Sequence, residues 1–161
     1  MKMLLNLTAI LATTVLATLA QATPLVGDYS NFKLTVNAEG QTIVGTYEMA
    51  LVAKTAAGFK MTRTTKFDNQ PAQHEEEDVN TEDLANDEFI NVVLESCTEQ
   101  GGASEVVTVT AGTFNTCALP TETGKVWVTH APFGIVKVQE TTQEGYLVNL
   151  ELQSFVNGKA Q

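Results

Sequence analysis

Hydrophobic and polar residues alternate along most of this chain with a period of two, which is the pattern of β-strands that bury one face. In an early segment, for example, Phe32, Leu34 and Val36 alternate with polar neighbours. Short turn sequences such as Ala38-Glu39-Gly40 separate the alternating segments, so consecutive strands are expected to pair antiparallel. The pattern predicts strands at 32–36, 41–54, 59–68, 105–110, 114–119, 125–130, 134–142 and 146–156.

The middle of the chain breaks this pattern. Residues 73–80 are very polar and predict a strand at an exposed edge of the sheet. Farther along, Phe89, Val92 and Val93 recur at helical spacing, a pattern that Cys97 can extend, and this predicts one short helix over 87–96. Adjacent valines are poor helix formers, so a strand is the alternative for that segment.

The fold class that follows is mainly β: a curved antiparallel sheet or incomplete β-barrel of about eight strands with one short α-helix. The chain shows no clear internal repeat, no low-complexity tract and no Pro/Gly-rich linker. We therefore expect residues 23–161 to form a single β-rich domain. That length is enough to bury a core without a metal ion to hold it.

Residues 1–22 have the features of a cleavable signal peptide. One basic residue precedes an uncharged run over 4–19, and Ala20-Gln21-Ala22 matches the small-x-small cleavage pattern. A membrane anchor is the alternative, but a spanning helix needs about 20 mainly apolar residues. Position 23 is Thr, so the lipid-attachment cysteine of a bacterial lipoprotein is missing. We expect an exported mature protein without an integral membrane segment, in a periplasm or outside the cell.

Two cysteines, Cys97 and Cys117, lie in the part of the chain that follows the signal peptide. An even number of cysteines in an exported chain favours a disulfide bond. A metal or redox pair is the rival interpretation, but such pairs use closer spacing or nearby histidines. We therefore predict a structural Cys97–Cys117 bridge, which would stabilise the fold by about 3 kcal/mol.

The chain is strongly acidic, because 19 Asp and Glu against 9 Lys and Arg give a formal net charge of -10. Between Phe67 and Gly124, thirteen acidic residues occur without any Lys or Arg. Such a surface repels phosphate groups, so nucleic acid is not an expected partner. The acidity either serves solubility, which is the simpler interpretation, or attracts a basic protein partner.

Three segments of the last third carry a family resemblance: Val109-Thr110-Ala111-Gly112-Thr113-Phe114, Val126-Trp127-Val128 and Pro132-Phe133-Gly134-Ile135-Val136-Lys137. Together they resemble poorly characterised bacterial exported proteins that are similar to the half-barrel superfamily of periplasmic lipoprotein carriers. The resemblance implies a periplasmic location and a curved sheet around an apolar cavity for acyl chains. It transfers no functional residue, because its motifs are turns and strands.

Arg63 is the only arginine and is the first candidate ligand contact. On a strand it shares one face with Phe59, Met61 and Phe67, so a cation lies among apolar side chains. A buried guanidinium needs a partner, because an unpaired buried charge costs several kcal/mol. Arg63 therefore either anchors the carboxylate or phosphate head of an apolar ligand that the other three residues line, or it reaches water or an internal acid.

Other chemistry has less support in the sequence. His74, Glu76 and Asp78 would share one strand face, but their spacing matches no metal motif, and a solvated acidic surface is the simpler interpretation. Trp127 is expected to pack in the core. The chain has no Gly-x-Ser-x-Gly turn, no Gly-rich phosphate loop and only two histidines. We therefore assign no catalytic residue, no metal site and no cofactor.

The function expected from these observations is that of an exported, non-enzymatic protein that binds an apolar or lipid-like ligand, as a carrier would. Arg63, Phe59, Met61 and Phe67 are its candidate contacts. The alternative is an acidic cell-envelope interaction module that meets a basic protein, whose affinity should fall steeply with salt. A hydrolase that uses two carboxylates ranks last, because no pair is singled out.

Overall fold

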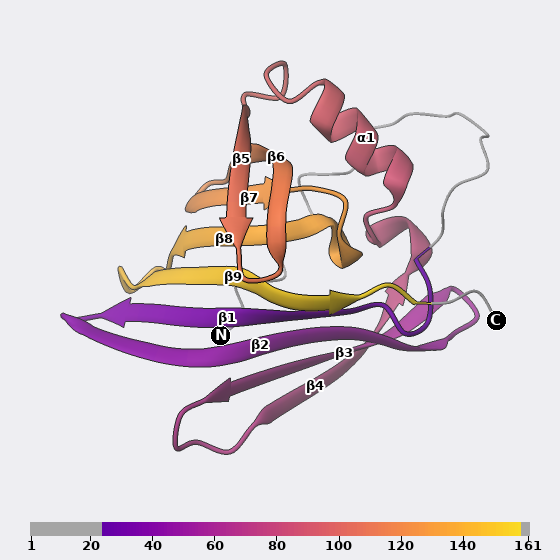
Figure 1. Ribbon diagram of the computed structural model, residues 1–161. Coiled ribbons are helices and arrows are strands. Elements are labelled where there is room, and N and C mark those ends of the chain that lie inside the picture. The colour runs from indigo at the N-terminus through magenta and orange to yellow at the C-terminus, as the bar shows by residue number, and fades with distance from the viewer. Residues whose placement is uncertain (1–23, 159–161) are drawn as a thin grey trace.

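A computed structural model describes residues 24–158, and within them nine strands and one α-helix form the architecture in Figure 1. The predicted signal peptide, residues 1–22, lies outside the described residues. The strands are β1 (Tyr29–Ala38), β2 (Gln41–Lys54), β3 (Gly58–Phe67), β4 (Gln73–Asn80), β5 (Ala103–Val109), β6 (Gly112–Pro120), β7 (Gly124–Val128), β8 (Ile135–Thr141) and β9 (Leu147–Val156). The helical elements are α1 (Asp87–Glu95) and the short 3-10 turns η2 (Thr81–Asp83) and η3 (Pro132–Gly134).

The strands form one antiparallel sheet in the order β4-β3-β2-β1-β9-β8-β7-β6-β5. Strands β1–β4 make one meander and β5–β9 a second, in which neighbours along the chain are also neighbours in the sheet. The two meanders meet where β1 pairs with β9, for example at Leu34 opposite Leu150. The sheet is open, because β4 and β5 stand at its two ends.

The predicted fold class is confirmed, since the described chain is mainly antiparallel β with one short α-helix. The nine strands are the eight alternating segments and the polar segment 73–80, which forms β4 and pairs with β3. As predicted, this strand lies at an edge of the sheet. Within residues 24–158, the chain contains no helix with the length and apolar character that crossing a membrane requires.

Helix α1 agrees with the predicted helix and begins at a side-chain cap. The side-chain oxygen of Asn86 accepts a hydrogen bond from the backbone N–H of Phe89 at 2.8 Å, which satisfies one of the free donors of the first turn. Ile90 and Val93 form the buried face of the helix, whereas Val92 is 47% exposed. The spacing therefore predicts the element correctly, although Val92, one of the residues that indicates it, lies outside the buried face.

The main hydrophobic core lies between α1 and one face of the sheet. Phe32 of β1, Val136 of β8 and Leu152 of β9 are buried there with Val93 of α1. Phe32 stands opposite Leu152, so the junction of the two meanders runs through this core. Apolar residues of strands that are distant in sequence thus meet under a single helix.

A disulfide bond joins Cys97, just after α1, to Cys117 on β6, as predicted. Neither cysteine side chain reaches solvent, and the described chain holds no free cysteine. A Cβ atom at Gly102 would lie 2.8 Å from Cys117 Sγ, so the absence of a side chain lets the turn pass against the bridge. The bridge ties the helix to the β5–β6 side of the sheet.

The β5–β6 hairpin runs at a steep angle to β8 and β9 (Figure 1). Next to it, the backbone N–H of Ala111 donates to the carbonyl oxygen of Leu152 on β9 at 3.2 Å. Trp127 is only 7% exposed, and its indole N–H donates to Glu105 of β5 at 2.8 Å. This bond lowers the pKa of the Glu105 carboxyl. Trp127 is therefore a packing residue, as the sequence predicts.

Candidate functional site

The four predicted ligand contacts share one face of β3 but do not surround one cavity. Phe59 and Met61 are 2% and 3% exposed and form a small apolar cluster with Leu51. Phe67 is only partly buried and packs against the main core instead. The structure thus brings Phe59 and Met61 together and separates them from Phe67. Their contact with a ligand stays a prediction.

Arg63 is paired with an acid on the neighbouring strand. Its Nη2 atom lies 2.5 Å from Glu77 Oε1, and the two side chains are 18% and 35% exposed. Glu77 is therefore the internal acid that the sequence leaves open as a partner for Arg63. A ligand anion at this guanidinium would compete with the Glu77 carboxylate.

The Arg63–Glu77 pair should couple in stability by about 0.5–1 kcal/mol, since both groups keep some contact with solvent. Urea unfolding of Arg63→Met, Glu77→Gln and the double variant measures this coupling as the departure from additivity. The same cycle on Lys60 and Glu76, a more exposed pair at 2.9 Å, serves as the control and should give less. Additive effects of Arg63→Met and Glu77→Gln would contradict a stabilising ion pair.

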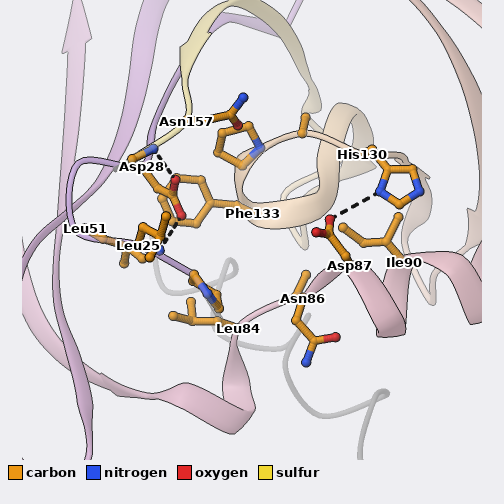
Figure 2. Close-up of a pocket in the computed structure, with 15 residues that line it drawn as sticks. Leu25, Asp28, Leu51, Leu84, Asn86, Asp87, Ile90, His130, Phe133 and Asn157 are labelled. Atoms are coloured by element: carbon orange, nitrogen blue, oxygen red, sulfur yellow. Dashed lines mark hydrogen bonds and ion pairs between the residues drawn. The ribbon is translucent and has the colours of Figure 1, made fainter. Parts of the chain in front are cut away.

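A cleft of about 360 Å³ opens where the N-terminal turn, the start of α1 and the turn after β7 meet (Figure 2). One wall is the turn at 25–28, which the carboxylate of Asp28 holds in place. Asp28 Oδ2 accepts from the backbone N–H of Leu25 at 2.9 Å, and Oδ1 accepts from that of Gly158 at 2.7 Å. Figure 2 shows Leu25 and Asp28 beside Phe133 on this side of the cleft.

The opposite wall consists of the start of α1 and His130. The Nδ1 atom of His130 lies 3.4 Å from Asp87 Oδ1, and its Nε2 atom lies 3.1 Å from Asn91 Oδ1. The predicted strand 125–130 is too long, because β7 ends at Val128 and the chain then turns toward η3. His130 consequently belongs to a turn that faces the helix, as Figure 2 shows.

The floor of the cleft is apolar. Leu51, Leu84 and Phe133 line it, and all three also belong to the apolar cluster that contains Phe59 and Met61. Phe59 and Met61 do not line the cleft themselves. They support its floor from the interior of the protein.

Phe133 has a backbone conformation that is uncommon for a large side chain, with φ 63° and ψ 6°. The turn around it is held from two sides: buried Ser30 donates through Oγ to the carbonyl oxygen of Pro132 at 3.3 Å, and a Cβ atom at Gly134 would lie 3.0 Å from that of Ala85. Residues in such sparsely populated conformations collect at binding and active sites. The turn thus presents the Phe133 ring at the cleft in a fixed position.

A second hollow, of about 620 Å³, adjoins the cleft and shares four residues with it, Pro24, Leu84, Ala85 and Asn86. The described residues that line the two hollows include no Lys or Arg. Anionic ligand groups are therefore disfavoured at this site. The carboxylates come from Asp28 and Asp87 in the cleft and from Glu82 and Asp83 in the second hollow.

The polar cluster at 74–78 is engaged with β3. His74 Nδ1 lies 3.0 Å from Thr64 Oγ1, and Lys60 Nζ lies 2.9 Å from Glu76 Oε1 and 3.5 Å from Asp78 Oδ1. Throughout residues 24–158, no three or more His, Cys, Asp or Glu side chains are arranged to hold a metal ion.

Comparisons with known proteins identify no family for this chain. No protein-family model matches it, and no curated protein sequence matches it. A solved structure described as the crystal structure of MucB in complex with MucA(peri) matches 84% of this chain and 52% of its own, with a TM-score of 0.48 and 10% sequence identity. The chain spans about half the length of that neighbour. The sequence resemblance to periplasmic lipoprotein carriers stays a prediction.

None of the residues that line the cleft is among the ligand contacts predicted from the sequence. Leu25, Asp28, Leu84 and Asn157 lie in turns or at the ends of elements, where no periodicity marks them. Phe133 has one sequence signal, because it lies within the Pro132–Lys137 segment of the family resemblance.

Proposed function

We propose that the protein is an exported, non-enzymatic binding protein whose ligand is a small amphipathic molecule, apolar or lipid-like over most of its surface. The proposal is carried by the cleft of Figure 2, in which Leu51, Leu84 and Phe133 form an apolar floor beneath a polar rim. Its volume of about 360 Å³ falls in the range of small-molecule pockets. Export is supported by the signal-peptide pattern of residues 1–22.

The rim of the cleft restricts the polar part of such a ligand. Asp28 and Asp87 stand on opposite walls without a lining Lys or Arg, so an anionic head group would be repelled. Asn86 and Asn157 add side-chain amides, which donate and accept hydrogen bonds. A head group with hydroxyl or amide functions fits this rim, while the hydrocarbon part covers the floor.

Leu84→Asn should weaken binding of Nile red, a neutral apolar dye, about tenfold. Leu84 lines both hollows, and burial of a leucine side chain contributes about 1.5–3 kcal/mol, of which 1.4 kcal/mol already corresponds to tenfold. Fluorescence titration of the mature chain, as its own host exports it, measures the affinity. The matched control is Val106→Asn on β5, where the side chain is 70% exposed and lies outside both hollows, so the affinity should not change.

Native mass spectrometry of the same exported protein, followed by solvent extraction, should find a co-purifying amphipathic molecule. That molecule should be reduced in the Leu84→Asn protein and retained in the Val106→Asn protein. Equal dye affinity in all three proteins, with no co-purifying molecule in any of them, would contradict a ligand site in the cleft.

A further inference from the structure

Asn157 is the only asparagine of the chain that is followed by a glycine. In an Asn-Gly sequence the backbone nitrogen of the glycine can attack the side-chain carbonyl carbon of the asparagine, because no side chain on the glycine hinders the approach. The Asn157 side chain is exposed at the rim of the cleft and makes no hydrogen bond within the described chain. No contact therefore keeps its amide away from the backbone of Gly158.

The fold requires the glycine at position 158. A Cβ atom there would lie 2.6 Å from the carbonyl oxygen of Val26 and 2.8 Å from the Cβ atom of Leu25. Residue 158 thus packs directly against the backbone of the turn at 25–28. A larger residue, which would slow the attack on Asn157, is excluded at this position unless the turn moves.

Asp28 holds the nitrogen atom that would attack. The backbone N–H of Gly158 donates to Asp28 Oδ1 at 2.7 Å, a bond to a charged acceptor, which is stronger than a neutral one (Figure 2). The carboxylate is itself fixed, because Oδ2 accepts from the N–H of Leu25 and the Asp28 carbonyl oxygen accepts from that of Leu51 at 2.9 Å. The Gly158 nitrogen must leave this bond before it can turn toward Asn157 and lose its proton.

We infer that Asn157–Gly158 is a site of spontaneous deamidation, and that the bond to Asp28 slows the reaction in the folded protein. The Gly158 nitrogen forms a bond to Cγ of Asn157, and the bond from Cγ to the side-chain nitrogen breaks. That nitrogen leaves as ammonia, which carries the proton of the Gly158 N–H. Water then opens the resulting succinimide ring to aspartate or isoaspartate at position 157, so the sequence needs no oxidant or reductant.

The reaction would change the cleft irreversibly. Either product adds a carboxylate to a rim that already carries Asp28 and Asp87, with no Lys or Arg among the described lining residues. Isoaspartate also lengthens the main chain by a methylene group, which moves the Gly158 N–H away from Asp28. The turn at 25–28, one wall of the cleft, then loses this attachment. The inference concerns the protein without a ligand, so it can fail while the proposed function holds, and the reverse.

The test follows the mature chain, as its own host exports it, during incubation at neutral pH. Mass spectrometry of its peptides measures deamidation at position 157. The folded protein should react about tenfold more slowly than the same chain unfolded in urea, as expected when one hydrogen bond to a charged group must break. Asp28→Ala should remove most of this difference, whereas Asp28→Asn, which keeps an acceptor oxygen, should retain part of it.

Two controls separate the bond from general stability. Phe67→Ala weakens the core at a residue that lines neither hollow, so its folded form should react at the unchanged rate. Asn157→Gln should give no product at position 157, because its longer side chain must close a larger ring. Circular dichroism confirms that each variant is folded; if Asp28→Ala is not, Asp28→Asn decides. The inference is overturned if folded and unfolded chains react equally fast, or if the folded Asp28 variants react no faster than the unchanged protein.

Discussion

Replacing Phe32 with alanine should lower the free energy of unfolding by about 3–5 kcal/mol. Phe32 is 1% exposed and stands on β1 between Tyr47 of β2 and Leu152 of β9. Because the two meanders meet at β1 and β9, its ring packs against both. Truncation removes this burial and leaves a cavity between strands whose hydrogen bonds hold them in place. Urea unfolding followed by circular dichroism measures the loss, which is a large part of the roughly 5–15 kcal/mol that stabilises a typical domain.

Phe67→Ala is the matched control, because Phe67 ends β3 and is only partly buried. It should lower the free energy of unfolding by about 1–2 kcal/mol. Equal losses for Phe32→Ala and Phe67→Ala would contradict the view that the β1–β9 junction is the centre of the core.

The strands were predictable because alternation is a local signal. Strand β2 has the predicted limits, Gln41–Lys54, and the residues before it explain its start. Glu39 and Gly40 have φ of 50° and 79°, a left-handed turn that an Ala-Glu-Gly sequence permits. The pairing of β1 with β9 was not predictable in the same way, since it joins opposite ends of the described chain and depends on how the two meanders share a core.

Helix α1 shows a limit of periodicity in a short element. Phe89, Val92 and Val93 fit helical spacing, but of these only Val93 is fully buried. The buried side chains are Ile90, Val93 and Cys97, which follow one another at helical intervals. In so short a helix, the apolar residues are compatible with more than one buried face. Contacts with the rest of the protein determine which face is buried. The bond from Cys97 to β6 favours the face that the structure shows.

Of the candidate site, only the apolar residues behind the floor of the cleft were predictable from the sequence. Alternation on β3 identifies Phe59 and Met61 as an apolar face, and this pair lies behind the floor of the cleft. The floor itself includes Leu84 and Phe133, which come from turns, and a backbone φ of 63° at Phe133 leaves no periodic trace in a sequence.

Removing the Cys97–Cys117 bridge should lower the free energy of unfolding by about 3 kcal/mol. The bridged residues are 20 apart in sequence, and in the chain-entropy model a loop of that length gives a stabilisation of this order. The double variant Cys97→Ala/Cys117→Ala measures the effect by urea unfolding. Alanine is preferred to serine, because both positions are buried and a hydroxyl there would lack a partner.

The same variant should also loosen α1 more than the centre of the sheet. The bridge ties the end of the helix to β6, whereas Phe32 and Leu152 keep their contacts without it. Hydrogen exchange should therefore rise at the amides of α1 before it rises at those of β1. Reduction of the unchanged protein should reproduce the loss of stability and leave the double variant unaffected. Equal unfolding midpoints for the oxidised protein and the double variant, or two reactive thiols in protein exported by its own host, would show that the bridge does not stabilise this fold.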